Sequence, residues 1–347
     1  MSGVGRPLRV VQWATGNIGS RSLRAVIEHP ALELVGVHVH SADKVGMDAG
    51  ELCGTAPTGI RATASIDDVI ALEPDCVLYM ASSLDAAEVS AVLAAGSNVV
   101  TTRGELHRPA SMDPGLRGQI EAACEAGGSS IHSTGSSPGF ISEALPIVLT
   151  SIQRTLDCLT IEEYADLSRR PSPELLFGVM GFGRAPAEMS EARLSHGRTS
   201  FGPSLELVAD ALGLPLDGLE AGGDVAVARS DVTIAAGTIE AGTVAAQRVT
   251  VDGIRGGRAL LRFCASWYCT TDLEPAWDLR PTGWRVNVEG DAPLDIDLPF
   301  PVPLDRMAET APGYTANRAV NAVEVVCAAP PGIRTTVDLP QVIARLG

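Results

Sequence analysis

Short apolar runs rich in β-branched residues alternate with stretches of helical periodicity through the first half of the chain. The apolar runs predict strands over residues 8–13, 32–39, 76–80, 98–102 and 130–134. The segments between them predict helices over residues 17–28, 45–53, 66–72, 85–95 and 116–126, with Ser65 capping the third. Strands that alternate with helices form right-handed βαβ units, so we predict an α/β domain with a Rossmann-type parallel sheet.

The pattern changes near residue 138. Helices are expected over residues 141–152, 174–180 and 204–212, and residues 159–165 alternate like a half-buried strand. Residues 224–288 form a run of strands with glycine-rich breaks, among them Gly222-Gly223 and Gly253, which predicts an antiparallel meander. A last helix is expected over residues 317–327. The second half is therefore predicted to be an α+β domain with a largely antiparallel sheet.

A dinucleotide fingerprint lies between the first predicted strand and the first helix. Residues 14–19 spell Ala-Thr-Gly-Asn-Ile-Gly, with alanine in place of the first glycine. Gly16 lets the backbone approach a pyrophosphate, Gly19 lets the helix pack on the strand, and the helix N-terminus attracts phosphate. We therefore expect Thr15, Gly16, Asn17, Ile18 and Gly19 to bind the cofactor. The alternative is a turn glycine followed by a packing glycine.

The end of the second strand discriminates between dinucleotides. NAD enzymes place a carboxylate there for the ribose 2′-hydroxyl, but this chain has His40 and Ser41, and no acid before Asp43. Lys44 follows, and it is the single lysine in the sequence. We expect His40, Ser41 and Lys44 to hold a 2′-phosphate, so NADP(H) is favoured and NAD(H) stays possible.

Ligands of such a sheet lie beyond the carboxyl ends of its strands. Ala81, Ser82, Ser83, Thr102 and Ser136 occupy those ends and are predicted cofactor contacts, or alternatively simple turn residues. Glu105 is the ionisable residue best placed for catalysis, and a partly closed pocket is expected to raise the pKa of its carboxyl group. Alternatively, Glu105 is a surface residue of a loop charged by Arg103 and Arg108. His107 is a second candidate, lining the substrate pocket as a proton donor, or alternatively a solvated loop histidine.

Composition narrows the class of protein. The net charge of −16 disfavours a nucleic-acid partner, and no apolar run is long enough to span a membrane. The seven cysteines include no CxxC pair, which favours reduced thiols in a cytoplasm. His38 and His40 are the only histidines with chelating spacing, and we expect strand-end polarity there and no metal. A single lysine disfavours Schiff-base chemistry.

Several short segments resemble those of one superfamily, and the resemblance runs along nearly the whole chain. They are residues 10–19, 45–50, 98–102, 138–140, 320–322 and 331–333. The superfamily has a dihydrodipicolinate-reductase-like N-terminal domain and includes 2,4-diaminopentanoate dehydrogenase and the NAD(P)H-dependent amine dehydrogenases. The sequence lacks the paired histidines and later lysine of dihydrodipicolinate reductase itself, so that enzyme's reaction is not expected.

The resemblance implies a dinucleotide-binding domain over residues 1–138, completed by 311–347, and a substrate-binding and dimerisation domain over 139–310. It implies that Glu105 binds ammonia or the substrate amine, and that Phe140 and Tyr164 shape the pocket. Asn321, in the segment 320–322, is expected to contact the cofactor. A homodimer follows from the same resemblance.

These features predict an oxidoreductase that transfers hydride from NADPH to an imine formed from ammonia and a ketone or aldehyde. The reverse reaction deaminates an amine oxidatively. Two alternatives stay open: a reductase of the same fold that acts on another C=O, C=N or C=C bond without ammonia, and a dinucleotide-binding sensor without turnover.

Overall fold

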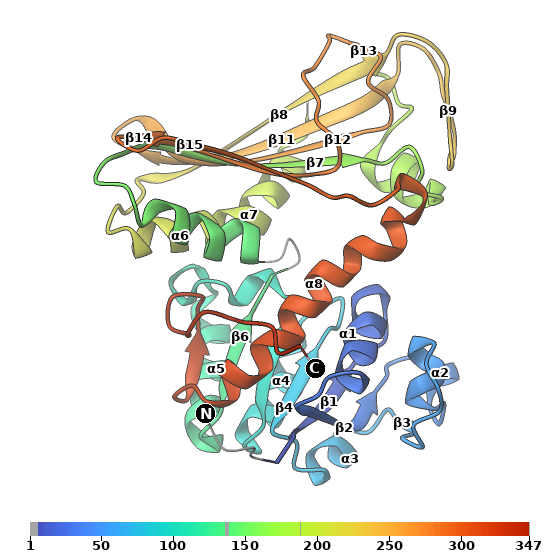
Figure 1. The fold of residues 1–347 in the computed structure, drawn as a ribbon, viewed down its shortest axis with the longest axis vertical. Helices are drawn as coiled ribbons and strands as arrows, with labels where there is room; N and C mark the ends of the chain where they lie inside the picture. The colour runs from blue at the N-terminus through green and yellow to red at the C-terminus, as the bar shows by residue number, and fades with distance from the viewer. Residues whose placement is uncertain (1–5, 136–138, 188, 347) are drawn as a thin grey trace. The chain divides into compact units, whose positions relative to one another are not determined.

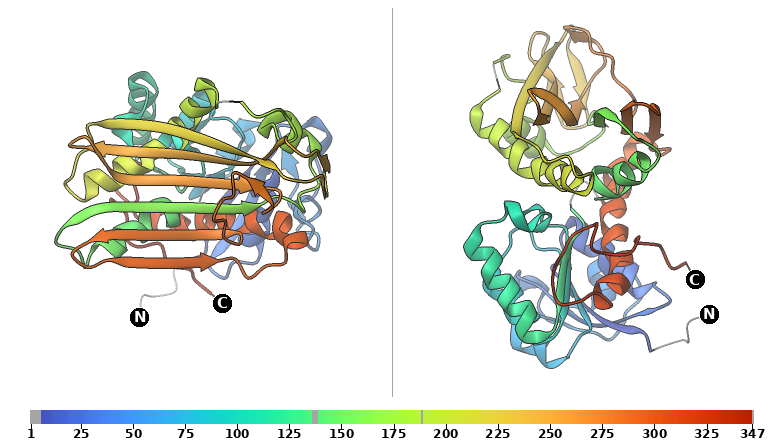
Figure 2. Two further views of the ribbon diagram at one scale, coloured as in Figure 1. Left: turned by 90° about the horizontal axis from the view of Figure 1, so that it is seen from above. Right: turned by 90° about the vertical axis from the view of Figure 1, so that its left-hand side faces the viewer.

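The computed structural model describes residues 6–135, 139–187 and 189–346, and the chain divides into two compact units (Figures 1 and 2). The first unit comprises Met1–Phe140 together with Ala311–Gly347, and the second comprises Ile141–Thr310. A C-terminal segment thus completes the N-terminal unit.

The first unit is built on a seven-stranded parallel sheet in the order β16-β6-β5-β4-β1-β2-β3. Its strands are β1 (Leu8–Trp13), β2 (Leu32–His38), β3 (Ala62–Thr63), β4 (Cys76–Tyr79), β5 (Asn98–Thr101), β6 (Ser130–Ser133) and β16 (Gly332–Arg334). The chain order reverses between β1 and β4, which is the Rossmann arrangement and creates a crevice beyond their carboxyl ends. The predicted parallel sheet is confirmed.

Helices cover both faces of this sheet. They are α1 (Asn17–Ile27), α2 (Ala49–Cys53), α3 (Ile66–Ala71), α4 (Ala86–Ala94), α5 (Pro114–Gly127) and α8 (Leu304–Cys327). One buried cluster joins β1, β4 and β5 to α4 and α5, and a second joins the same strands to α1 and the C-terminal half of α8. Side chains cap these helices where expected: the Ser65 hydroxyl accepts a hydrogen bond from the Asp68 N–H at 3.1 Å.

The second unit contains a seven-stranded sheet in the order β13-β8-β11-β12-β7-β14-β15, shown face-on in the left view of Figure 2. Its strands are β7 (Leu156–Asp166), β8 (Gly218–Ala228), β11 (Val244–Arg255), β12 (Arg258–Tyr268), β13 (Leu273–Glu274), β14 (Gly283–Gly290) and β15 (Leu294–Pro299), and β9 (Val232–Ile234) pairs with β10 (Gly237–Ile239) as a separate hairpin. Only the pairing of β7 with β12 is parallel, so the sheet is largely antiparallel, as predicted.

The three glycines named above as breaks, Gly222, Gly223 and Gly253, all lie inside strands, and two of them have close neighbours. Gly223 is in β8 and Gly253 is in β11. A Cβ atom at Gly223 would lie 2.3 Å from the sulfur of Met189, and one at Gly253 would lie 2.6 Å from Leu216 Cδ1. These glycines allow neighbouring side chains to approach the sheet closely, which is the other common reason for glycine in a strand.

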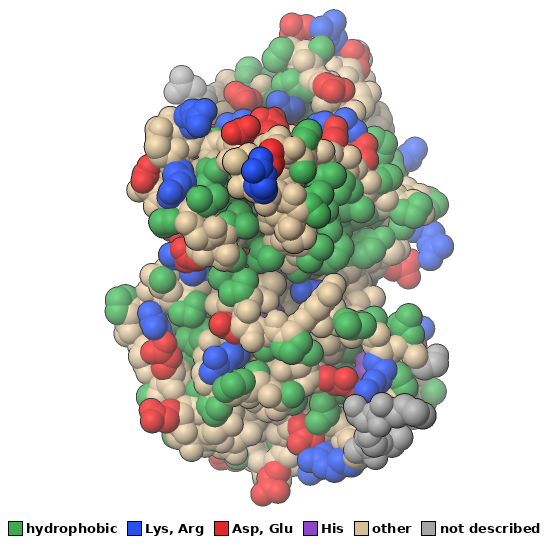
Figure 3. Space-filling model, turned by 60° about the vertical axis from the view of Figure 1, so that its left-hand side comes forward, with side chains coloured by type: hydrophobic (Ala, Val, Ile, Leu, Met, Phe, Trp, Pro, Cys, Tyr) green, Lys and Arg blue, Asp and Glu red, His purple; other side chains and the backbone are tan. Residues whose placement is uncertain are grey.

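The strands of this sheet alternate between an apolar face and a polar face. Leu159 and Ile161 of β7 pack in one buried cluster with Leu205 and Val208 of α7 (Glu191–Ala211), next to α6 (Leu145–Thr150) (Figure 1). The alternate positions of β7 carry polar side chains. On the side of the molecule drawn in Figure 3, acidic and basic side chains lie among apolar areas.

Two helices begin earlier than the sequence pattern predicts. α7 starts at Glu191 rather than residue 204 and contains Pro203, and α8 starts at Leu304 rather than residue 317 and contains Pro312. Both predicted starts were wrong. Proline disfavours helical conformation in the residue before it, yet both helices continue through their prolines. The predicted helix over residues 174–180 is present, in π-helical form.

Candidate active site

The loop between β1 and α1 has the backbone that a dinucleotide fingerprint requires. Ala14, at the position usually held by the first glycine, adopts a left-handed conformation with φ of 67°. Its N–H donates to the His38 carbonyl at 2.9 Å, and its carbonyl accepts from the buried Gln12 side chain at 2.9 Å. Gln12 in turn accepts a hydrogen bond from Ser22 of α1 at 2.6 Å. The tight turn therefore persists without glycine because both polar groups of Ala14 are paired.

Gly16 and Gly19 have different surroundings. A Cβ atom at Gly16 would meet no atom within 4 Å, whereas one at Gly19 would lie 2.2 Å from the Ala14 carbonyl oxygen. Gly19 thus permits the close packing of α1 on the loop, and Gly16 leaves open space where α1 begins. The first turn of α1 has no acidic residue and no side-chain cap, so its N–H groups are available to an anion. The residues present therefore fit a pyrophosphate.

Lys44 lies against this loop. Its ammonium donates to the Thr15 carbonyl at 3.3 Å and to the Thr15 hydroxyl at 3.2 Å. The segment after Lys44 is held by Asp48, whose carboxylate accepts hydrogen bonds from the N–H groups of Gly50, Thr58 and Gly59 at 2.8 to 2.9 Å. The structure therefore brings the end of β2 to the glycine loop.

An aromatic cluster supports the same strand end. The Trp13 indole N–H donates to His40 Nε2 at 3.3 Å, and the Trp13 ring stacks on His38 with centroids 3.7 Å apart. His38 is buried, with 3% exposure, and burial followed by the neighbouring His40 lowers the pKa of His38 to about 4. His40 and Ser41 are exposed. Because His40 Nε2 accepts the hydrogen bond from Trp13, it is Nδ1 that carries the proton in the neutral form of His40.

Glu105 lies on a short 3₁₀ turn, Gly104–Leu106, directly after β5. Its carboxylate Oε1 pairs with Arg103 Nη2, and Arg103 Nη1 also donates to the Ser82 carbonyl at 2.5 Å. Burial alone would raise the pKa of Glu105. The hydrogen bond from Arg103, a hydrogen bond from the Glu105 N–H, and the charges of Arg103 and His107 together lower this pKa below its ordinary value. The expected rise in pKa is therefore wrong, because the neighbouring guanidinium outweighs partial burial.

The remaining predicted residues of the first unit occupy the strand ends or α8. Ala81 is buried, Ser82 and Ser83 are exposed after β4, and Thr102 is half-buried after β5. His107 is buried one residue beyond the Glu105 turn. Asn321 lies half-buried in the part of α8 that packs on the parallel sheet. Ser136 falls outside the described residues.

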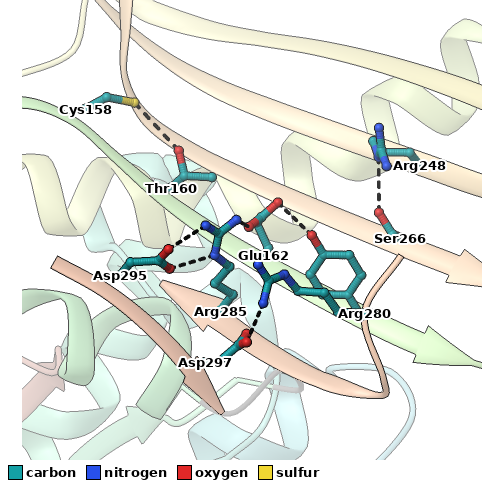
Figure 4. Close-up of polar contacts among 10 residues, drawn as sticks. Cys158, Thr160, Glu162, Arg248, Ser266, Arg280, Arg285, Asp295 and Asp297 are labelled. Atoms are coloured by element: carbon teal, nitrogen blue, oxygen red, sulfur yellow. Dashed lines mark hydrogen bonds and ion pairs between the residues drawn. The ribbon is translucent and has the colours of Figure 1, made fainter. Parts of the chain in front are cut away.

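The two aromatic pocket candidates have different settings. Phe140 is 40% exposed and begins the π-helical segment Phe140–Ala144. Tyr164 lies on the polar face of the second unit's sheet, where its hydroxyl donates to Glu162 at 2.9 Å. Arg285 binds the same Glu162 carboxylate (Figure 4). Burial and then Glu162 raise the pKa of Tyr164. Tyr164 as a pocket wall stays a prediction.

Three supporting residues were missed by sequence reasoning. Gln12 and Trp13 read as ordinary strand positions, and Arg103 as part of a charged loop. A buried glutamine at a strand end that precedes a glycine loop is a usable signal, since a buried amide needs partners. Nothing in the pattern indicates that Arg103 turns toward Ser82 and Glu105.

A Rossmann-type sheet with a dinucleotide-type loop is the fold on which many NAD(P)-dependent oxidoreductases bind their cofactor. Comparison with known families gives the same class. The profile of the dihydrodipicolinate reductase N-terminus matches residues 10–104, and that of the 2,4-diaminopentanoate dehydrogenase C-terminal domain matches residues 140–347.

The chain is 30% identical to an amine dehydrogenase of Streptomyces virginiae, over 98% of this chain and 99% of that protein. Among solved structures, the amine dehydrogenase of Mycobacterium smegmatis shares the fold, with a TM-score of 0.74, 20% identity and 97% of each chain covered. GenD2 of gentamicin A biosynthesis, solved with NAD, has a TM-score of 0.50 and 16% identity over 93% of this chain and 94% of its own. The chain belongs to the family of 2,4-diaminopentanoate dehydrogenase and the amine dehydrogenases.

Within the described part of the chain, no helix is long and apolar enough to cross a membrane.

Proposed function

We propose that this oxidoreductase catalyses NADPH-dependent reductive amination, in which a ketone or aldehyde and ammonia give an amine, and the reverse oxidative deamination. The observation that carries the proposal is the position of Glu105 on the turn directly after β5, at the edge of the sheet where ligands bind, with its carboxylate paired to Arg103. A negative group at this edge attracts an ammonium ion or a protonated amine. The family relationship supports a nitrogen substrate.

The cofactor would be held by two groups of residues. Gly16 and the N-terminus of α1 would bind the pyrophosphate. Lys44, Ser41 and the Nδ1–H of His40 would supply donors to a 2′-phosphate, and the strand end lacks the carboxylate that a 2′-hydroxyl would want. When bound, the nicotinamide supplies or accepts the hydride. These donors favour NADP(H) over NAD(H).

Glu105 would bind the nitrogen of the substrate and take a proton from it as ammonia adds to the carbonyl. A carboxylate of lowered pKa is fully ionised at neutral pH, so it can hold a cation before any proton moves. Accepting a proton from a positioned nitrogen is general-base catalysis, which typically contributes 10² to 10⁴-fold. His107 and Phe140, which follow β5 and β6 in the chain, stay candidates for the walls around this nitrogen.

We also infer a homodimer formed through the polar face of the second unit's sheet. That face carries pairs of opposite charge, which suit a surface that meets its own copy. Arg285 pairs with Asp295 (Figure 4), and Arg262 pairs with Asp252. Sedimentation of the purified protein tests this, and a monomer at micromolar concentration would exclude it. A cytoplasmic location stays a prediction, based on the reduced thiols expected from the cysteine spacing.

The test of function is NADPH oxidation with a panel of ketones and aldehydes, each with and without ammonium. Turnover that requires ammonium is the expected result. Equal turnover without ammonium would instead make the protein a carbonyl, imine or alkene reductase. Cofactor binding without turnover on the whole panel would contradict the amination proposal.

A further inference from the structure

Arg103 is anchored at the point where three strands of the parallel sheet end. Its N–H donates to the Thr101 hydroxyl at 3.3 Å, and its carbonyl accepts from the Ser133 hydroxyl at 2.7 Å. Thr101 ends β5 and Ser133 ends β6, so the backbone of Arg103 is held by both strands. The Arg103 side chain therefore starts from a fixed backbone position.

The guanidinium joins two further segments. Nη1 donates to the Ser82 carbonyl after β4, and Nη2 pairs with Oε1 of Glu105. The third nitrogen, Nε, is buried and has no hydrogen-bond partner among the described atoms. A buried, partnerless guanidinium nitrogen is unusual, because Arg normally satisfies its donors. The guanidinium therefore holds one carboxylate oxygen of Glu105, and its Nε–H is a further hydrogen-bond donor at the ligand-binding edge of the sheet.

Resting on the amination proposed above, we propose that Arg103 is a positioning residue that clamps Oε1 of Glu105 to the loop after β4 and leaves Oε2 to bind the substrate nitrogen. In the described part of the chain no other side chain donates to the Glu105 carboxylate, and its side chain is 42% exposed. A carboxylate offers several lone-pair directions on two oxygens, so occupation of one oxygen leaves the other able to accept from an ammonium ion.

The clamp differs from an ordinary surface ion pair. Isolated exposed pairs contribute little, because two long side chains lose freedom in forming them. Arg103 is only 27% exposed, and its backbone and fork make contacts with three other segments, so that freedom is already restricted. A rotating carboxylate would present its oxygens in many directions, whereas a clamped one presents Oε2 in one, which favours a positioned nitrogen.

The clamp also explains why Glu105 stays charged. The positive guanidinium favours the carboxylate over the carboxylic acid, and it offsets the effect of partial burial. An enzyme that binds ammonium through Glu105 loses that ability when the carboxylate takes up a proton from solution. Arg103 therefore extends activity toward lower pH.

The test compares Arg103→Gln and Arg103→Lys with wild type. Arg117→Gln is a matched control, because Arg117 also pairs with a glutamate, Glu121 at 2.8 Å, on an exposed face of α5 in the same unit. Glutamate δ-¹³C NMR follows the Glu105 carboxyl group, assigned by the signal missing in Glu105→Gln. The same proteins are assayed for ammonium-dependent turnover against pH, and NADPH titration and thermal melting report on folding.

For Arg103→Gln we expect the Glu105 carboxyl to titrate at higher pH than in wild type, with the acid limb of kcat/KM for ammonium moving in the same direction. Turnover at neutral pH should fall about tenfold or more, since the clamp is lost. Arg103→Lys keeps the positive charge but lacks the planar guanidinium with its paired donors. It should therefore keep the wild-type titration of Glu105 but not the wild-type turnover. Arg117→Gln should change neither.

An unchanged Glu105 titration in Arg103→Gln overturns the clamp, and so does wild-type turnover in that variant. If Arg103→Gln does not fold, Arg103→Lys decides, because full wild-type turnover there would contradict the need for a fork. The NMR titration does not depend on activity. A wild-type protein that aminates nothing would therefore refute the proposed function, while the titration would still decide whether Arg103 holds Glu105.

Discussion

The Lys44 ammonium lies 3.2 Å from the hydroxyl oxygen of Thr15, although the two residues are 29 positions apart in the chain. The contact exists because β1 and β2 are parallel neighbours, so the segments that follow them meet at the same edge of the sheet. The single lysine of the chain is thereby tied to the loop proposed to bind the pyrophosphate. The proposed 2′-phosphate site and the geometry of the loop therefore meet at this contact.

Replacement of Lys44 tests the proposed 2′-phosphate site. Lys44→Ala should weaken NADPH binding by about 10- to 150-fold, since a charge-assisted hydrogen bond contributes about 1.5–3 kcal/mol. NADH binding should change far less, because NADH lacks the phosphate. Fluorescence titration with both cofactors measures the ratio. Arg61→Ala is the control, because Arg61 is an exposed cation that donates to the carbonyl of Gly46, two residues after Lys44. Equal losses for both cofactors would remove Lys44 from the phosphate site.

The two glycines of the loop should fail in different ways. Gly19→Ala puts a methyl group 2.2 Å from the Ala14 carbonyl oxygen, so we expect about 1–3 kcal/mol lower stability together with weaker cofactor binding. Gly16→Ala meets no protein atom and keeps an ordinary φ of −74°. It should retain stability within about 0.5 kcal/mol while cofactor affinity falls at least about tenfold, because the methyl occupies the pyrophosphate's space. Denaturant unfolding and cofactor titration separate the two, and normal cofactor binding by a folded Gly16→Ala would refute the site.

Removal of the charge on Glu105 tests its role toward nitrogen. Glu105→Gln keeps size and hydrogen-bonding ability but loses basicity, so ammonium-dependent turnover should fall by about 10²-fold or more. NADPH affinity should stay close to that of wild type, because the carboxylate addresses the substrate. Glu121→Gln, which removes an exposed carboxylate of α5, should leave both unchanged. Retained amination would exclude Glu105 as base, and a collapse of NADPH binding would make it a cofactor residue.

Burial of His38 predicts a pH-dependent stability. The pKa of His38 is lowered to about 4 in the folded state, against about 6.5 when unfolded, so the unfolded state binds more protons below pH 6.5. Stability should therefore fall as the pH drops from about 6.5 toward 4, by about 2 kcal/mol between pH 7 and pH 5. His38→Phe keeps a ring beside Trp13 and should flatten this dependence, whereas His196→Gln, at an exposed histidine, should not. Urea unfolding at the two pH values decides, and identical slopes for wild type and His38→Phe would contradict the assignment.

Local sequence patterns were enough for the parallel sheet and the glycine loop. The β1 strand, residues 14–19 and α1 are contiguous, and their hydrophobic periodicity, turn residues and helix start are readable from neighbours in the chain. The same reasoning misplaced the starts of α7 and α8, where Pro203 and Pro312 lie inside helices. Proline's local preference is a weak signal when packing along the rest of a long helix outweighs it.

The sequence alone did not determine the directions of the side chains or which charged groups lie next to one another. Residue types and strand ends predicted that Lys44 and Glu105 lie at the ligand edge, because parallel strands bring their carboxyl ends together. The contact of Lys44 with Thr15 depends on which strands are neighbours. The lowered pKa of Glu105 depends on Arg103 turning toward it, although only one residue separates them in the chain. A pKa follows from distances between charges and from burial, and only the folded chain determines those distances.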